Sequence, residues 1–230
     1  MTEPVRITIA KDGPYLVSGP APLTVLDIET NARGESITWA ERRELPVSGE
    51  YHLCRCGESR NKPFCDGTHA KIGFDGTETA SLETVMEQAD VLDGPTMQLA
   101  DAEVLCAFAR FCDPNGRVWN QVEESDDPQT RANLIRQTGN CPAGRLIAID
   151  KSTGEAIEPS LSQSIGVVED PAEKCSGPLW VRGGIELVGS DGTNYEVRNR
   201  LTLCRCGRSD NKPFCNGAHA AEPKFRDGLA

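Results

Sequence analysis

Aromatic side chains and histidine are scarce in this sequence, and long apolar runs are missing from it. Aromatic residues make up 5% of the 230 residues, and three residues are histidine. Residues 1–20 lack a basic segment followed by an apolar run, which argues against a secretory signal. No stretch reaches the length that crosses a bilayer, so we expect a soluble protein with no membrane partner.

Basic residues are also fewer than acidic residues in this sequence. There are 24 Lys and Arg against 35 Asp and Glu, a formal net charge of −11. Nucleic-acid phosphates would repel such a chain, so we expect no nucleic-acid partner. Disulfides persist mainly in oxidising compartments, and the chain has ten cysteines without a recognisable signal. We therefore expect reduced cysteines and a cytoplasmic location.

Patterns of catalytic residues are missing as well. The sequence contains no recognisable Ser/His/Asp arrangement, paired-carboxylate pattern or nucleotide-binding loop. Two of the three histidines belong to a repeated motif described next, which leaves His52 alone. We therefore expect that the protein is not an enzyme.

The sequence does contain one cysteine–histidine motif twice. Cys54-x-Cys56-x8-Cys65-x3-His69 recurs as Cys204-x-Cys206-x8-Cys215-x3-His219, and 13 of 17 positions are identical between 54–70 and 204–220. Two cysteines two apart on a strand point the same way, and a Cys and a His four apart share one face of a helical turn. Two such ligand pairs suit a 2Fe-2S core, in which each iron takes two protein ligands. A single zinc ion bound by three Cys and one His is the alternative.

The strings CRCGESRNKPFCDGTH and CRCGRSDNKPFCNGAH closely resemble the CDGSH iron–sulfur (mitoNEET-like) family. The resemblance covers about residues 13–72 and 177–223, roughly half of the chain. It implies two 2Fe-2S clusters, bound by the three Cys and one His of each motif. Asp66 becomes Asn216 in the second copy, and the serine of the family name is Thr68 and Ala218; none of these is a ligand.

The resemblance implies electron transfer or redox sensing, with a redox partner protein. Cluster storage and transfer to an apo-protein acceptor is one alternative, and a zinc-stabilised interaction scaffold is the other. Because family proteins are homodimers with one cluster per protomer, two modules in one chain suggest an intramolecular pseudo-dimer. We therefore expect a monomeric chain.

The duplication extends upstream of the motifs and predicts a mainly β, α+β fold. The Gly-Pro pairs at 13–14 and 177–178 are 164 residues apart while the motifs are 150 apart, so the first copy has 14 extra residues. We assign them to a charged loop at Asn31–Val47. Composition and turn signals predict short strands. They are Val5–Ile9, Tyr15–Val17, Leu23–Ile28, Tyr51–Arg55, Leu179–Val181, Ile185–Val188, Tyr195–Val197 and Leu201–Arg205.

The middle of the chain differs in kind and predicts a small ferredoxin-like α+β insert. We divide the chain into a first module at 1–75, a middle segment at 76–171 and a second module at 172–230. Helices are predicted at Asp101–Phe111 and Pro128–Gln137 and a strand at Arg145–Asp150. A helical turn is predicted to begin at each third motif cysteine, with Asp66 or Asn216 as its N-cap.

The middle segment holds further cysteines. Cys106-x5-Cys112 followed by Cys141-Pro142 resembles a divergent single-cluster ferredoxin, with Ala109 where a further ligand would sit. Three cysteines can hold a 3Fe-4S core, and Cys175 could complete a four-iron site. The alternative is a relic that packs these cysteines as small apolar residues. The sequence leaves a third cluster open.

Overall fold

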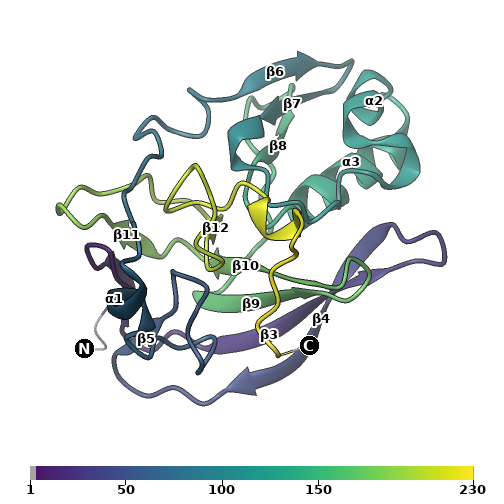
Figure 1. Cartoon of the computed structure of the whole chain (residues 1–230). Coiled ribbons are helices and arrows are strands. Elements are labelled where there is room, and N and C mark those ends of the chain that lie inside the picture. Colours follow the sequence, from purple (N-terminus) through teal and green to yellow (C-terminus); the bar gives the residue numbers. More distant parts are fainter. Residues whose placement is uncertain (1–3, 230) are drawn as a thin grey trace.

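The computed structural model describes residues 4–229, which form a mainly β structure with a few short helices (Figure 1). Two sheets carry the two cysteine–histidine motifs, and a third, small sheet lies with two helices in the middle segment. The predicted α+β, mainly β class is confirmed. None of the helices in residues 4–229 is long and apolar enough to span a bilayer.

The first sheet is four-stranded, in the order β11-β1-β2-β5. Its strands are β1 (Arg6–Ile9), β2 (Tyr15–Ser18), β5 (Tyr51–Leu53) and β11 (Glu186–Val188). β2 runs antiparallel to both β1 and β5, whereas β1 runs parallel to β11. One strand of this sheet therefore comes from the far end of the sequence.

The second sheet is five-stranded, in the order β12-β10-β9-β3-β4. Its strands are β3 (Leu23–Thr30), β4 (Ser36–Leu45), β9 (Ser164–Asp170), β10 (Cys175–Arg182) and β12 (Arg200–Leu203). β9 runs antiparallel to β10 and parallel to β3. β9 and β10 are buried on both faces, as expected for central strands.

The two sheets exchange strands. β1, β2 and β5 occupy the places in the first sheet that β9, β10 and β12 occupy in the second. The strand that follows β2, β3, pairs in parallel with β9, and the strand that follows β10, β11, pairs in parallel with β1. Each half of the chain thus completes the sheet of the other half.

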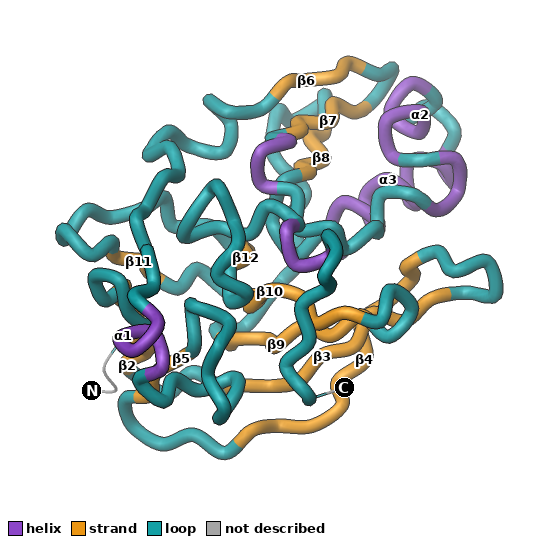
Figure 2. The backbone as a smooth tube through the Cα atoms, in the orientation of Figure 1, coloured by secondary structure: helices purple, strands orange, loops and turns teal. Residues whose placement is uncertain are grey.

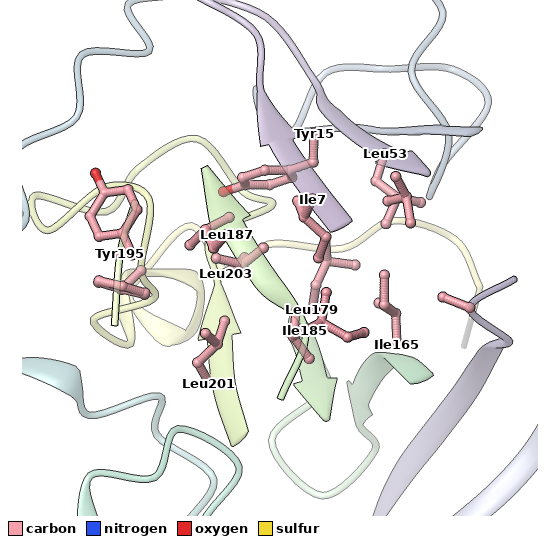
Figure 3. Packing of buried hydrophobic residues seen from close by; sticks show 14 of the residues in the cluster. Ile7, Tyr15, Leu53, Ile165, Leu179, Ile185, Leu187, Tyr195, Leu201 and Leu203 are labelled. Atoms are coloured by element: carbon pink, nitrogen blue, oxygen red, sulfur yellow. The ribbon is translucent and has the colours of Figure 1, made fainter. Parts of the chain in front are cut away.

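A shared hydrophobic core accompanies this exchange (Figure 3). Ile7, Tyr15 and Leu53 from the first half pack in one cluster with Leu179 and Leu203 from the second half. All five side chains are at most 1% exposed. Because burying one such side chain contributes about 1.5–3 kcal/mol, the two halves depend on each other for stability.

The middle segment forms a small layer of its own. Its sheet has the order β6-β7-β8, with β6 (Asp90–Asp93), β7 (Met97–Asp101) and β8 (Leu146–Asp150). Its helices are α2 (Val118–Glu123) and α3 (Pro128–Asn140), with the 3-10 turns η1 (Glu103–Leu105) and η2 (Pro114–Gly116). The predicted helix at Pro128–Gln137 and strand at Arg145–Asp150 are confirmed.

Two predicted elements of the first copy and the middle segment are wrong. The segment Asn31–Val47 is not a loop, because Ser36–Leu45 forms β4 and pairs along β3. Its charged side chains are tolerated because β4 is an edge strand with exposed residues. Asp101–Phe111 is not a helix, because β7 and η1 take its first residues and an irregular loop takes the rest.

Smaller corrections concern the second copy and the motif turns. Tyr195–Val197 forms no strand, and only an isolated bridge joins Val188 to Asn194 nearby. The turns after the third cysteines are α1 (Thr68–Ile72) and η3 (Ala218–Ala220), and glycines stand at their N-caps. Asp66 and Asn216 instead accept a hydrogen bond from the first residue of each turn.

Candidate metal centres

Each motif begins where a strand ends. Cys54 follows β5 and Cys204 follows β12, and the chain then loops back so that Leu53 bridges Phe64 and Leu203 bridges Phe214. The loop regions that carry both motifs appear as teal tube in Figure 2. Strand ends therefore fix the first two cysteines, and the returning loop brings the other two ligands to them.

The first two cysteines of each motif form a pair. The Sγ atoms of Cys54 and Cys56 are 3.7 Å apart, and those of Cys204 and Cys206 are also 3.7 Å apart. Two metal–sulfur bonds of about 2.3 Å at a tetrahedral angle span about 3.8 Å between sulfurs. Each cysteine pair is thus spaced to bind one metal ion.

The third cysteine and the histidine form the second pair. The Sγ of Cys65 lies 3.3 Å from Nδ1 of His69, and the Sγ of Cys215 lies 3.4 Å from Nδ1 of His219. One sulfur and one nitrogen on a tetrahedral ion would be about 3.6 Å apart. Among residues 4–229, no three His, Cys, Asp or Glu side chains gather as ligands of one ion. The donors therefore come in pairs.

Hydrogen bonding favours a thiolate at one cysteine of each pair, although burial opposes it. The hydrogen bond between the two thiols of each cysteine pair lowers the pKa of one of them, Cys54 or Cys206, to about 6. The same bond raises the pKa of its partner. The amides of Gly67 and Gly217 donate to the thiols of the third cysteines at 3.4 Å. Donors of this kind stabilise a sulfur that carries negative charge.

A serine in each motif loop positions the third cysteine and was not among the predicted site residues. The Oγ of Ser59 donates to the carbonyl of Phe64 at 2.6 Å, and the Oγ of Ser209 donates to that of Phe214 at 2.7 Å. Both hydroxyls also accept from the amide two residues on. These bonds fix the return of the loop to the third cysteine. The signal was present, because the serine is one of the 13 identical positions.

The two motifs lie back to back. A Cβ on Gly57 would stand 2.6 Å from the carbonyl oxygen of Cys206, and a Cβ on Gly207 would stand 2.5 Å from that of Cys56. Both glycines have a positive φ, which other residues rarely adopt. Tyr15 adds a bond across the halves, because its hydroxyl donates to the carbonyl of Cys204 at 2.8 Å. The glycine after the second cysteine therefore allows close approach of the two sites.

The pair formed by the third cysteine and the histidine is buried in the second motif and partly exposed in the first. Cys215 and His219 are 2% and 4% exposed, while Cys65 and His69 are only partly buried. Ala107 and Ala143 of the middle segment pack against Cys215. Burial, and then Arg205, lower the pKa of His219 to about 4. The middle segment shields the second site from water and leaves the first site accessible.

The middle cysteines divide into two groups. Cys106, Cys112 and Cys141 line one cavity. Burial, Asp113 and then the other two thiols raise the pKa of Cys112 to about 12. Cys175 lies on β10 and does not line that cavity. The structure thus brings three of the four cysteines together.

Sequence families account for most of these residues. The family described as iron-binding zinc finger, CDGSH type, matches residues 12–70 and 176–220. Both cysteine–histidine modules are CDGSH-type domains. The family described as divergent 4Fe-4S mono-cluster matches residues 92–151, between them. No curated protein and no solved structure matches the chain.

These matches make the chain an iron–sulfur protein with two CDGSH modules around a ferredoxin-like middle segment. The donor set of the modules fits such a group. Thiolate sulfur and imidazole nitrogen are ligands that iron–sulfur clusters accept, and the ligands of each module stand as two pairs at metal-ligand spacing.

Proposed function

We propose that each CDGSH module binds a 2Fe-2S cluster through three cysteines and one histidine, and that the protein transfers single electrons to a redox partner protein. The arrangement of ligands in pairs carries this proposal. One iron would be bound by the Cys54 pair or the Cys204 pair, with the other bound by the cysteine–histidine pair. A bound cluster supplies the one-electron chemistry, since the side chains themselves do not change oxidation state.

The histidine sets the electronic character of each site. Four thiolates would leave an oxidised 2Fe-2S centre with a charge of about −2, whereas three thiolates and a neutral imidazole leave about −1. An added electron then meets less repulsion. We expect reduction potentials above those of ferredoxins with four cysteine ligands.

The exchange of strands supports an intramolecular pseudo-dimer. β3 completes the sheet of the second half and β11 completes that of the first, while Gly57 and Gly207 make reciprocal contacts at the two motifs. Because both modules belong to one chain, the strands that they exchange, β3 and β11, are already paired within that chain. We therefore propose that the protein works as a monomer of 24.9 kDa, which sedimentation can test.

Cluster donation to an apo-protein is the second candidate, and the exposure of one site favours it. Cys65 and His69 are partly exposed, whereas their counterparts Cys215 and His219 are buried. An acceptor thiol can reach the first pair more easily. Donation is therefore proposed for the first module alone, with the second module retaining its cluster.

Metal analysis tests the proposal. The anaerobically purified protein should contain iron and acid-labile sulfide in nearly equal amounts, with visible absorption that bleaches on reduction by dithionite. A colourless protein with about one zinc ion per motif would refute it and favour the interaction scaffold. Incubation with an apo-ferredoxin separates the two functions, because donation moves the absorption to the acceptor and electron transfer leaves it in place.

A further inference from the structure

Three cysteines that are distant in sequence line one cavity of the middle segment. Cys106 follows η1, Cys112 ends the same loop, and Cys141 follows α3. Arg200 fixes the last of them, since its guanidinium donates to the carbonyl of Cys141 at 2.6 Å. The cavity measures about 20 Å³, which holds a single water, so the loop must widen to admit anything larger.

The loop between the first two of these cysteines has the backbone of an anion site. Phe108 and Arg110 have positive φ values of 55° and 60°, although neither is glycine. Within residues 4–229, no backbone group accepts a hydrogen bond from the amides of residues 107–112. Ala107, Ala109 and Phe111 are nevertheless buried. The amides of these three buried residues require acceptors, and a backbone with residues in the left-handed conformation can turn N–H groups toward an anion.

The ligand count differs from that of a four-iron ferredoxin. In the ferredoxin pattern C-x2-C-x2-C, a second cysteine would stand midway between Cys106 and Cys112, where this chain has Ala109. Cys175, the remaining cysteine of the middle group, lies outside the cavity. Three thiols therefore face the cavity, and the ligand for one corner iron of a cubane is missing.

We infer that Cys106, Cys112 and Cys141 bind a third cluster, of the three-iron 3Fe-4S type. The sulfides of such a cluster would accept hydrogen bonds from the free amides of the loop, and each of its irons would take one of the three thiolates. A three-iron cluster differs from the four-iron cluster in the description of the matching family, because no fourth cysteine lines the cavity.

The third site touches the second CDGSH module. A Cβ on Gly217 would stand 3.3 Å from the carbonyl oxygen of Cys106 and 3.4 Å from the Cβ of Phe108. Ala107 and Ala143 pack against Cys215, a proposed ligand of that module, and Cys141 packs against the same group of buried side chains. A cluster held by the three cysteines would thus adjoin the buried CDGSH site.

Electron paramagnetic resonance of the full-length protein, reconstituted anaerobically with ferrous iron and sulfide, tests this inference. An oxidised 3Fe-4S cluster is paramagnetic, whereas oxidised 2Fe-2S and ordinary 4Fe-4S clusters give no signal. We expect an oxidised-state signal of about one spin per chain and about seven irons per chain. Oxidised protein that gives no signal while showing full CDGSH absorption would overturn the three-iron site.

Three variants sharpen the test. Cys112→Ser should lose the oxidised-state signal and about three irons while keeping the CDGSH absorption. Cys175→Ser is the matched control and should keep both; loss of its signal would overturn the ligand assignment. Ala109→Cys restores the missing thiol and should abolish the signal while adding about one iron. An unchanged signal in that variant would contradict the claim that the cluster lacks one iron because residue 109 is not a cysteine.

The variants also separate this inference from the proposed function. If Cys112→Ser remains folded by circular dichroism but shows no iron–sulfur absorption, the 2Fe-2S assignment of the CDGSH modules fails. If it keeps that absorption and the unmodified protein gives no oxidised-state signal, only the third cluster fails.

Discussion

At the scale of single residues, the two motif histidines stand in different environments. His69 is partly exposed beside an open surface, whereas His219 is 4% exposed and lies under the middle segment. A histidine binds iron only through an unprotonated nitrogen, so protons compete with the metal for it. Access of water to the imidazole would therefore decide how readily acid releases a cluster bound at each motif.

Replacing each histidine by cysteine tests this difference. His69→Cys should slow acid-induced loss of the visible absorption by at least about fivefold near pH 5, because a thiolate ligand replaces an accessible imidazole. His219→Cys should change the rate of loss much less. The decay of absorption after a pH jump measures both rates, and equal effects of the two variants would contradict the account.

The pKa values of buried carboxylates near the second motif also depend on their surroundings. Glu169 is fully buried and accepts a hydrogen bond from Arg205 at 2.7 Å. Burial raises its pKa to about 6, against the opposing effect of Arg205. The unfolded chain then releases this proton near pH 4.5 while the folded chain holds it to about pH 6. The contribution of Glu169 to stability is present at low pH and is lost as the pH rises through this window.

Glu169→Gln should therefore raise the free energy of unfolding at pH 7 by about 1–2 kcal/mol, because it removes a buried charge while Arg205 keeps its ion pair with Asp227. The gain should shrink as the pH falls toward 5. Glu158→Gln is the control of opposite sign: burial raises the pKa of Glu158, but Arg200, Asn199 and Arg198 together lower it by more, so this variant should lose stability at pH 7. Urea unfolding measures both, and destabilisation by Glu169→Gln would contradict the argument.

At the scale of elements, strand β12 holds the middle segment in place through Arg200. Its fully buried guanidinium donates to the carbonyls of Thr138, Cys141 and Leu146 and pairs with Glu158 at 2.7 Å. The end of α3 and the start of β8 thus depend on one side chain of the second module. The shielding of the second CDGSH site rests on the same contact.

Arg200→Met should cost about 3–5 kcal/mol, because it leaves a carboxylate and several carbonyls without their donor. Arg198→Met is the matched control, since the one hydrogen bond of Arg198 within residues 4–229 goes to the carbonyl of Ala143, and its loss should cost about 1 kcal/mol. Urea unfolding gives the two values, and hydrogen exchange should show faster opening of α3 in the first variant. Equal costs would contradict the role of Arg200.

Sequence patterns predicted elements well where local signals were strong. The β-branched and aromatic runs at Tyr15–Val17 and Leu179–Val181 lie in strands β2 and β10, and Pro128 marked the start of α3. The helix predicted at Asp101–Phe111 was wrong. The residues of this segment favour a helix, but the chain instead forms the end of β7, the turn η1 and an irregular loop that carries Cys106. Positive φ at Phe108 and Arg110 cannot be inferred from residues that normally avoid it.

At the scale of the whole molecule, the exchange of strands was beyond the reach of local patterns. β1 pairs with β11 across 180 residues, and β3 pairs with β9 across about 140, so neither pairing has a signal in a short window. The repeat singled out eight candidate ligand positions, and the structure brings these residues together in pairs. It could not predict that one site would be covered, because the covering loop belongs to the middle segment.

The reciprocal glycine contact offers a test of the association of the two halves. Gly57→Ala should destabilise the protein by about 1–3 kcal/mol more than Gly34→Ala. Both glycines have a positive φ, but a Cβ meets open space at Gly34 and the carbonyl of Cys206 at Gly57. Gly207→Ala should behave like Gly57→Ala. If urea unfolding gives the same loss of stability for all three glycine variants, the two motifs do not contact each other as described.

Mössbauer spectroscopy of ⁵⁷Fe-labelled protein tests the central claim most directly. It is best done on Cys112→Ser, in which the CDGSH modules hold the remaining iron. The account predicts that oxidised protein gives two doublets of equal area, one from iron bound by two cysteines and one from iron bound by cysteine and histidine. A single doublet, or protein that binds zinc instead of iron, would contradict it.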